Sequence, residues 1–281
     1  MREQLQSIIG FYSTNINDLS SVEFYALNKE VMRLARRASG MDNIQLTGMG
    51  PELHFLGQYL AGRAEPVVLD VGAYRGDYSM GALKANPGAK VFAFEPHPRT
   101  FAILKPKSRQ AGFAAFNLGC SDAEGALTLY DIADEDRSFR TTAYQEIIEG
   151  HLDRRSESFE VRTTTIDKFC AATDLDHLDL LKIDAEGHEM HILNGAAGML
   201  RSGKIEAIQF EFNELNAYSG RHFKEFVDIL PEYRFFLLLP DGIAALGEYD
   251  PREHENYVYQ NIVAIARWSK VLRPRPGAGN A

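Results

Sequence analysis

Cysteine is scarce in this sequence: among 281 residues, only Cys120 and Cys170 are cysteines. Two cysteines cannot supply the disulfide framework on which small secreted domains depend. The first residues also lack the apolar core of an export signal. We therefore interpret both cysteines as free thiols in a reducing compartment and expect a cytoplasmic protein.

Long apolar runs are missing as well. The most apolar run, residues 235–239, is only as long as a strand, whereas a membrane-spanning helix needs about 20 apolar residues. Basic residues are in deficit, because 30 Lys and Arg face 39 Asp and Glu, which gives a net charge of −9. Nucleic-acid-binding domains carry a basic face, so we expect neither a membrane nor a nucleic acid as partner. A basic, proline-containing stretch at residues 268–281 is expected to form a flexible tail.

The first part of the chain, residues 1–62, has a helical pattern. Ser20 and Glu23 have the spacing of a capping box, in which each side chain accepts a backbone N–H at the start of a helix. The helix that follows has one apolar face, which must be buried, so we expect a helical extension that acts as a lid or as a homodimer face. Apolar residues recur at steps of three and four on that face: Phe24, Leu27, Val31, Leu34 and Ala38.

Residues 63–267 alternate between apolar, strand-like runs and helical segments. This alternation is typical of a parallel sheet with helices on both faces. Charged residues of both signs interrupt it at residues 131–160, which we interpret as a long solvated loop, and such loops often cover a substrate. The strands are expected at residues 67–71, 91–94, 113–117, 126–130, 178–183, 205–212, 233–239 and 259–266.

The strongest local motif is the expected strand at residues 67–71, which runs into a turn and a helix. Asp70 lies at the end of the strand, Gly72 lets backbone approach a ligand closely, and Gly76 eases the entry into the helix. Ligands of doubly wound sheets bind beside such a turn, outside the carboxyl ends of the strands. A dinucleotide fingerprint needs a second glycine where Tyr74 stands. A nicotinamide-dependent oxidoreductase is therefore the less favoured alternative.

Polar residues also follow the next two strands. Glu95, followed by Pro96, ends the second strand, where an acid can bind both hydroxyls of a ribose. Ser121 and Asp122 follow the third strand, and short polar side chains there can bind an adenine edge. A strand-end acid and an Asx turn would explain the same residues without a ligand.

The later motifs narrow the class of protein. Thr165-Ile166-Asp167 and Lys182-Ile183-Asp184-Ala185-Glu186-Gly187 occur in this order, and with the first motif they resemble the FkbM family of S-adenosylmethionine-dependent methyltransferases over residues 66–267. The resemblance implies a Rossmann-like class I methyltransferase fold with a mostly parallel, seven-stranded sheet. Tyr74 departs from the family, which commonly has asparagine there. The resemblance implies an S-adenosylmethionine site at Asp70, Gly72, Tyr74, Gly76, Ser79, Glu95, Pro96, Cys120, Ser121, Asp122 and Asp184.

Transfer of a methyl group to a hydroxyl requires removal of the hydroxyl proton, so a general base or a metal ion is expected. Asp184 is the first candidate, because it ends the strand that follows the donor half, and Glu211 stands near the end of the next strand. These two carboxylates could bind Mg²⁺, which prefers oxygen ligands, or act without a metal. His188 is the third candidate, since histidine titrates near neutral pH. The residues expected to line the acceptor pocket are Glu186, Glu214, Arg221 and His222.

Together these features predict O-methylation of a hydroxyl on a natural product or a sugar by in-line transfer. N-methylation of amide side chains in a ribosomal peptide is the close alternative. A non-catalytic donor-binding partner is an alternative of another class. The expected acceptor is thus a small molecule, a glycan or a peptide.

Overall fold

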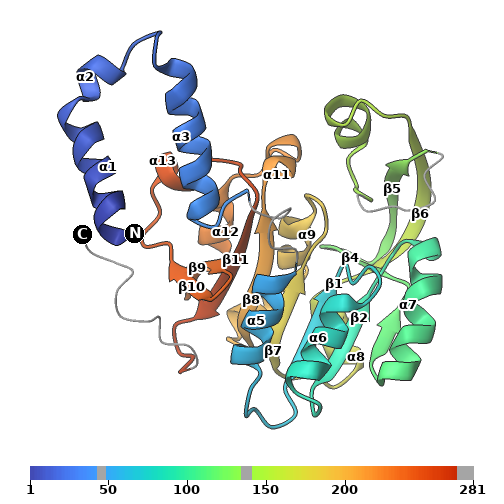
Figure 1. Cartoon of the computed structure of the whole chain (residues 1–281). Coiled ribbons are helices and arrows are strands. Elements are labelled where there is room, and N and C mark those ends of the chain that lie inside the picture. Colours follow the sequence, from blue (N-terminus) through green and yellow to red (C-terminus); the bar gives the residue numbers. More distant parts are fainter. Residues whose placement is uncertain (43–48, 134–140, 271–281) are drawn as a thin grey trace. The chain divides into compact units, whose positions relative to one another are not determined.

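The chain divides into two compact units, residues 1–43 and 44–281 (Figure 1). The computed structural model describes residues 1–42, 49–133 and 141–270. All candidate site residues belong to the second unit, and the expected basic tail lies outside the described residues from residue 271 onward. No helix in the described ranges is long and apolar enough to cross a membrane.

The first unit consists of three helices: α1 (Arg2–Thr14), α2 (Ile16–Leu19) and α3 (Tyr25–Ala38). The expected capping box at Ser20 is wrong, because α3 begins only after Phe24, whose side chain makes no capping bond. Asn28 stabilises the preceding turn instead, since its amide donates to the carbonyl oxygen of Leu19 (2.8 Å) and accepts from the hydroxyl of Tyr12 (3.1 Å). No residue of α3 is buried, so burial of its apolar face stays a prediction.

The second unit is built on an eight-stranded sheet with the order β10-β9-β11-β8-β7-β1-β2-β3. The strands from β3 to β8 in this order run parallel, whereas β11 is antiparallel to β8 and β9. The α/β class and the mostly parallel sheet are therefore confirmed. The sheet has one strand more than expected, because a tight turn at residues 240–241 returns the chain as β10 beside β9. The strands are β1 (Val67–Val71), β2 (Lys90–Phe94), β3 (Ala114–Phe116), β7 (Leu178–Ile183), β8 (Ile205–Phe212), β9 (Tyr233–Leu239), β10 (Gly242–Ala245) and β11 (Gln260–Ala266).

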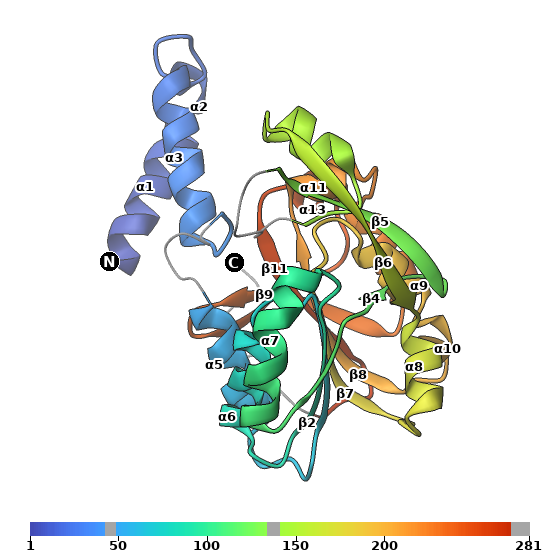
Figure 2. The same ribbon diagram turned by 90° about the vertical axis from the view of Figure 1, so that its right-hand side faces the viewer.

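Helices cover both faces of this sheet, with α5, α6 and α7 on one face and α8, α9 and α10 on the other (Figure 2). The compact unit begins at residue 44 rather than at residue 63, because α5 packs on α6 and on the β9–β10 hairpin. Phe55 and Tyr59 of α5 are fully buried in the core. The helices are α5 (Gly50–Tyr59), α6 (Asp77–Ala85), α7 (Pro98–Ala111), α8 (Ile166–Ala172), α9 (Glu189–Asn194), α10 (Ala197–Arg201), α11 (Glu214–Tyr218), α12 (Phe223–Ile229) and α13 (Pro251–His254).

A second, three-stranded sheet contains β4 (Gly119–Cys120), β6 (Ser156–Thr164) and β5 (Gly125–Ile132). β5 and β6 form a long antiparallel ribbon, drawn in green beside the main sheet in Figure 1. With the π-helix η1 (Ile147–His151) they make up the β5–β6 arm, residues 125–133 and 141–164. The expectation of a solvated loop at residues 131–160 is thus wrong for its described part. Leu129, Val161, Ile147 and Ile148 are buried, so a few apolar side chains anchor a segment that is rich in charged residues.

Candidate active site

The turn after β1 meets the end of β7 in very close backbone contact. Gly72 has φ +78°, and a Cβ atom on it would lie 1.7 Å from the carbonyl oxygen of Asp184. The N–H of Asp184 donates to the carbonyl oxygen of Val71 (3.0 Å). Glycine is therefore required here for packing between the two strand ends, and its close approach to a ligand stays a prediction. Gly76 has φ +84° and lies against Leu104 of α7 in the same way.

Asp70 is fully buried at the end of β1. The hydroxyl of Ser79 in α6 donates to its Oδ2 (2.6 Å), while Oδ1 has no partner among the described residues. Burial raises the pKa of Asp70, and the nearby ammonium group of Lys182 opposes that shift. Ser79 thus supports the acid from inside the protein, and Asp70 retains one acceptor oxygen for a further donor.

Glu95 is buried at the end of β2 and accepts two backbone N–H groups. Tyr74 donates to Oε2 (2.9 Å) and His97 to Oε1 (2.8 Å). Burial raises the pKa of Glu95 to about 7. The amide of Asn117 donates to the carbonyl oxygens of Glu95 and Pro96. Tyr74 therefore contributes its backbone to this group, and the loop after β3 fixes the strand end that carries the acid.

A chain of hydrogen bonds joins the end of β4 to the helices after β7. The hydroxyl of Ser121 donates to Asp122 (3.1 Å) and lies 3.0 Å from Nε2 of His188, so it accepts from that nitrogen. A guanidinium N–H of Arg221 donates to Nε2 of His191 (3.3 Å), and Nδ1–H of His191 therefore donates to Asp122 (2.8 Å). Asp122, which was expected to bind the donor, is thus connected through His191 to Arg221, which was expected on the acceptor side.

His188 is buried and stacks on His191, with ring centroids 4.4 Å apart. Burial and the neighbouring His191 lower the pKa of His188 to about 4. Its Nδ1 has no partner among the described residues. His188 is therefore a weak base at neutral pH. Cys120 nearby is also buried, and burial raises the pKa of its thiol, which makes it inert.

Asp184 lies just after β7, beside a buried cation that the sequence analysis missed. The ammonium group of Lys182 lies 2.9 Å from Oδ2 of Asp184. Burial alone would lower the pKa of Lys182, but the carboxylates of Asp184, Asp70 and Glu52 outweigh burial and raise it. The Asp184 side chain is 33% exposed, whereas that of Lys182 is only 6% exposed. A lysine between apolar residues near the end of a buried strand was the available indication of this role.

Glu211, near the end of β8, lies among polar side chains of neighbouring strands. Tyr259 donates to Oε1 (2.8 Å) and Asn213 to Oε2 (3.3 Å). Burial, followed by the charges of Asp184 and Glu186, raises the pKa of Glu211 well above its ordinary value. The structure therefore brings Asp184 and Glu211 into one electrostatic group, as expected from their strand ends, and favours the protonated form of Glu211.

Two buried acids that the sequence analysis missed support this region. Glu189 accepts the backbone N–H groups of Ala185 (3.1 Å) and Gly187 (3.2 Å), so it shapes the loop that carries Asp184. Burial raises the pKa of Glu189 to about 7. Glu52 of α5 accepts from the amide of Gln209 (2.8 Å), and burial raises its pKa as well. Helix positions gave no indication that either acid would face the interior.

The four expected acceptor residues take different positions. Glu186 has φ +49° and accepts a hydrogen bond from Thr142 of the arm at its carbonyl oxygen (2.9 Å). Arg221 forms an ion pair with Glu225 (3.0 Å) in addition to its bond to His191. The remaining two are more exposed: Glu214 lies 3.9 Å from His151 of the arm, and His222 accepts from Tyr257 (2.7 Å).

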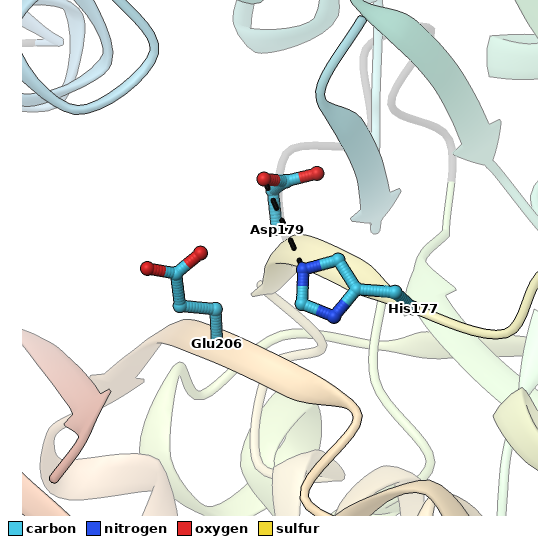
Figure 3. A group of neighbouring side chains, drawn as sticks. All are labelled: His177, Asp179 and Glu206. Atoms are coloured by element: carbon cyan, nitrogen blue, oxygen red, sulfur yellow. Dashed lines mark ion pairs between the residues drawn. The ribbon is translucent and has the colours of Figure 1, made fainter. Parts of the chain in front are cut away.

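A magnesium ion between Asp184 and Glu211 finds no support. Among the described residues, the one group of three donors close enough to share an ion is His177, Asp179 and Glu206 (Figure 3). That group lies at the amino ends of β7 and β8, opposite to Asp184. At the carboxyl ends, Lys182 already supplies the positive charge.

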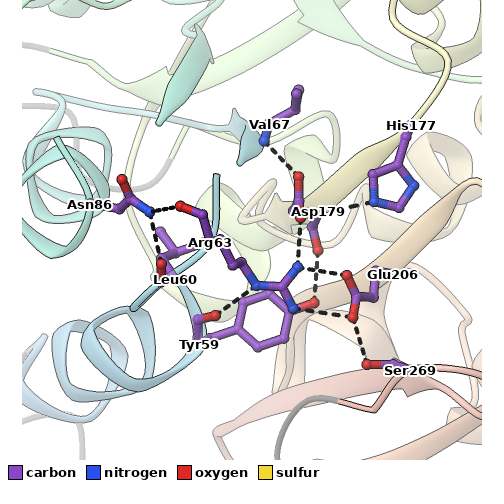
Figure 4. A network of polar contacts seen from close by, with 9 residues as sticks. All are labelled: Tyr59, Leu60, Arg63, Val67, Asn86, His177, Asp179, Glu206 and Ser269. Atoms are coloured by element: carbon purple, nitrogen blue, oxygen red, sulfur yellow. Dashed lines mark hydrogen bonds and ion pairs between the residues drawn. The ribbon is translucent and has the colours of Figure 1, made fainter. Parts of the chain in front are cut away.

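The His177 group is an ion-pair network rather than a metal centre (Figure 4). Arg63 donates to Asp179 Oδ1 (2.6 Å) and to both oxygens of Glu206 (2.7 and 3.1 Å). The N–H of Val67 donates to Asp179 Oδ2 (2.8 Å), and Ser269 donates to Glu206 (2.6 Å). Because every carboxylate oxygen already has a donor, a metal ion would have to displace the guanidinium group.

Several known proteins are similar to this chain. It is 25% identical over 203 residues to the 2-O-methyltransferase NoeI of Sinorhizobium fredii, a match that covers 64% of this chain and 77% of the relative. It is 29% identical over 141 residues to the hexuronic acid methyltransferase AglP of Haloferax volcanii, which covers 49% of this chain and 53% of the relative. The crystal structure of precorrin-6y C5,15-methyltransferase from Geobacter metallireducens aligns at a TM-score of 0.40 and 12% identity, covering 75% of this chain and 85% of that one.

Residues 70–237, which are more than half of the chain, match the model of the methyltransferase FkbM domain. This range begins at Asp70 and ends within β9. It therefore contains the acids Asp70 and Glu95, the loop that carries Asp184, and Glu211 in β8. The chain belongs to the FkbM methyltransferase family, and it is a methyltransferase.

Proposed function

We propose that this methyltransferase takes its methyl group from S-adenosylmethionine and transfers it to a hydroxyl of a sugar or another natural product. The observation that carries the proposal is the grouping at the carboxyl ends of β1, β2 and β7. Two buried acids, Asp70 and Glu95, lie on the donor side, and the partly exposed Asp184 is bonded to Lys182. The relatives support the acceptor class, since one is a 2-O-methyltransferase and the other a hexuronic acid methyltransferase.

The donor-side residues fit S-adenosylmethionine in their hydrogen bonding. Each carboxylate oxygen of Glu95 accepts one backbone N–H and has a second lone pair, which a ribose hydroxyl can use. Hydrogen bonds from two hydroxyls favour the ionised acid and offset the burial that raises its pKa to about 7. Asp70 Oδ1, buried without a partner among the described residues, can accept from the amino group of the donor.

Asp184 is the proposed general base. When bound, S-adenosylmethionine supplies a methyl group on a positively charged sulfur and leaves as S-adenosylhomocysteine. With the donor bound, the acceptor oxygen would receive the methyl group from the sulfur, and Asp184 would take the hydroxyl proton. Lys182 bonds to Oδ2, which leaves Oδ1 for the acceptor. Alignment of the acceptor oxygen, the methyl carbon and the sulfur supplies much of the rate in such a transfer.

Glu211 is proposed to orient the acceptor rather than to bind a metal. Its raised pKa favours the protonated form of the carboxyl group, and a protonated carboxyl group can donate a hydrogen bond. Tyr259, just before β11, and Asn213, just after β8, hold it in place. His188 is the weaker candidate for the base, because its pKa of about 4 makes it a poor proton acceptor.

Two measurements test the proposal. Calorimetry should detect binding of S-adenosylhomocysteine and no binding of NAD; the opposite result would overturn the proposed donor. Incubation with methyl-labelled S-adenosylmethionine and a panel of sugars, hydroxylated natural products and peptides should place the label on an oxygen. Label found only on peptide amide nitrogen would overturn the proposed acceptor and favour the N-methylation alternative.

A homodimer through the helices of residues 1–42 is a further part of the proposal. The support is the exposed apolar side chains of this unit, among them Leu27 and Leu34 of α3, which a second copy could cover. Sedimentation of the full chain should give the mass of two copies, and of one copy after Leu27→Lys and Leu34→Lys. A monomer before substitution would overturn the dimer without affecting the proposed reaction.

A further inference from the structure

A buried histidine and a buried aspartate join α7 to the β5–β6 arm. His97 is 3% exposed at the start of α7, and Asp131 is 1% exposed at the end of β5. Nε2 of His97 lies 3.2 Å from Oδ2 of Asp131, although 34 positions separate them in the sequence. Neither residue belongs to the predicted site, and the proposed reaction gives neither of them a role.

The hydrogen bonds around His97 fix the position of its ring proton. Nδ1 accepts the backbone N–H groups of Arg99 (3.1 Å) and Thr100 (3.5 Å), as expected of a residue that caps a helix. Because Nδ1 is an acceptor, Nε2 carries the proton and donates to Asp131. Oδ1 of Asp131 accepts the N–H of Ile132 (2.7 Å). The pair is therefore directional and is bonded to backbone on both sides.

His97 also contacts the donor-side acid and the second strand of the arm. Its backbone N–H donates to Oε1 of Glu95 (2.8 Å). Its ring meets Phe159 of β6 edge-on, with centroids 4.7 Å apart. One residue thus bonds to the acid proposed for the ribose, to β5 through Asp131, and packs on β6.

The arm reaches the acceptor side through Thr142 and Tyr144, which precede η1. Thr142 pairs with Tyr130 of β5 through two backbone hydrogen bonds (2.8 and 3.0 Å). The hydroxyl of Thr142 donates to the carbonyl oxygen of Glu186 (2.9 Å). The ring of Tyr144 lies over Gly187, 3.5 Å from the position of an added Cβ atom. The arm therefore contacts the loop that carries Asp184.

We propose that His97 and Asp131 are positioning residues that couple donor binding at Glu95 to the order of the β5–β6 arm. A ligand on Glu95 restrains the 95–97 loop, and the His97–Asp131 bond passes that restraint to the arm that covers residues 184–187. Coupling between two sites is reciprocal, so loss of the bond weakens donor binding as well as loosening the arm. The inference rests on the proposed donor.

Two variants remove the bond in different ways. His97→Asn keeps an oxygen that can cap α7 but is too short to reach Asp131. Asp131→Asn keeps the acceptor for Ile132 and places an amide N–H against the N–H of His97. The matched control is Glu157→Gln, which removes an exposed ion pair between Arg99 of α7 and Glu157 of β6. It breaks a second connection between α7 and the arm without touching the buried pair.

The experiment combines calorimetry with hydrogen exchange, using S-adenosylhomocysteine as the probe. In the wild-type chain and in Glu157→Gln, the probe should slow amide exchange in residues 125–133 and 141–164. In His97→Asn and Asp131→Asn, the dissociation constant should rise about 5- to 30-fold, which corresponds to the usual size of coupling between sites, and the arm should no longer respond. The double variant should lose no more affinity than either single variant, because all three lack the same bond.

Three outcomes would overturn the inference. Unchanged affinity in both single variants, or an arm that still responds to the probe in them, would show that the pair is merely structural. An equal loss of affinity and of arm response in Glu157→Gln would show that the exposed contact between α7 and the arm has the same effect as the buried pair. Absence of probe binding to the wild-type chain would instead overturn the proposed donor, and this inference with it.

Discussion

The same two strands carry an Asp–Glu pair at both ends. At the amino ends of β7 and β8, Asp179 and Glu206 share the guanidinium group of Arg63. At the carboxyl ends, Asp184 is bonded to Lys182, and Glu211 has no cation bonded to it. The pKa of Glu206 is lowered and that of Glu211 is raised. Two pairs that look alike in the sequence are therefore in opposite electrostatic states.

The two ends of these strands differ in whether their acids can still bind a ligand. Every carboxylate oxygen at the amino ends has a donor, and the Asp179 side chain is only 15% exposed. At the carboxyl ends, Asp184 is 33% exposed, and Asp70 retains an acceptor oxygen without a partner among the described residues. Polar groups without a partner and groups with shifted pKa values cost stability in a folded protein. Such groups cluster at functional sites. The carboxyl ends are thus available for a ligand, whereas the amino ends are complete.

Replacing the aspartate at each end of β7 should give the largest contrast. In Asp184→Asn the rate of methyl transfer should fall by about 10²- to 10⁴-fold, because an amide cannot accept the hydroxyl proton. Asp179→Asn should keep the rate per folded molecule. Initial rates of label transfer to an acceptor identified in the panel would measure both. A fully active Asp184→Asn would contradict the proposed base.

Removing the cation at the amino ends should mainly affect stability. Arg63→Met leaves the buried Glu206 and the half-buried Asp179 without their guanidinium counterion, and loss of one partner of a buried pair costs about 3–5 kcal/mol of the free energy of unfolding. Urea unfolding would measure it, with donor affinity unchanged. Glu65→Gln, which breaks the exposed ion pair with Lys90, is the control and should have no measurable effect. A stable Arg63→Met would mean that the network contributes nothing.

The two glutamates should respond to pH with opposite sign. Glu206 has a lowered pKa despite burial, because Arg63 and Ser269 bond to it, so its contribution to stability is present above its ordinary value of 4.5 and lost as the pH falls. Glu211 has a raised pKa, so its contribution is present below 4.5 and lost as the pH rises. The free-energy cost of Glu206→Gln should shrink toward acid, and that of Glu211→Gln should shrink toward neutral pH.

Unfolding measured across this pH range in wild type and both variants would settle the sign. Equal slopes for the two variants would contradict the electrostatic difference between the strand ends. Glu65→Gln again serves as the reference for general effects of removing one acid.

Divalent metal should produce the smallest effect at either end. Arg63 occupies the oxygens of Asp179 and Glu206, and Lys182 is paired with Asp184. A ligand stabilises the folded chain only when its concentration approaches the dissociation constant, so millimolar Mg²⁺ or a chelator should leave the midpoint of thermal unfolding unchanged. A clear shift that Glu206→Gln abolishes would instead indicate a metal site at the amino ends.

Much of the arrangement at the carboxyl ends of β1 and β2 could be predicted, because it depends on short local patterns. Asp70, Gly72 and Glu95 each follow an apolar run that reads as a buried strand, and parallel strands bring their carboxyl ends to one edge. The arm could not be predicted in this way. Its anchors, Ile147 and Ile148, are two apolar residues within a stretch rich in charged residues, and the pairing of β5 with β6 joins residues up to 38 positions apart.

The charge state of the site was also beyond local patterns. Lys182 and Glu189 sit in recognisable motifs, but their burial depends on what packs above them. Glu52 comes from a helix that was expected in the N-terminal extension, and Arg63 comes from the linker between that helix and β1. Arg63 meets Asp179 across 116 positions and Glu206 across 143 positions.

The sequence by itself determined the fold class, the order of the strands along the chain and the edge at which their acids gather. The first two follow from the spacing of apolar residues, which is a pattern of a few residues at a time. The third follows because parallel strands bring their carboxyl ends to one edge of the sheet. Only the tertiary structure decided which acids are neutralised, which hold a proton and how the arm is joined to the donor side. Those properties depend on burial and on charges brought close in space, and a carboxylate responds to its nearest cation and to lost water, whatever its position in the chain.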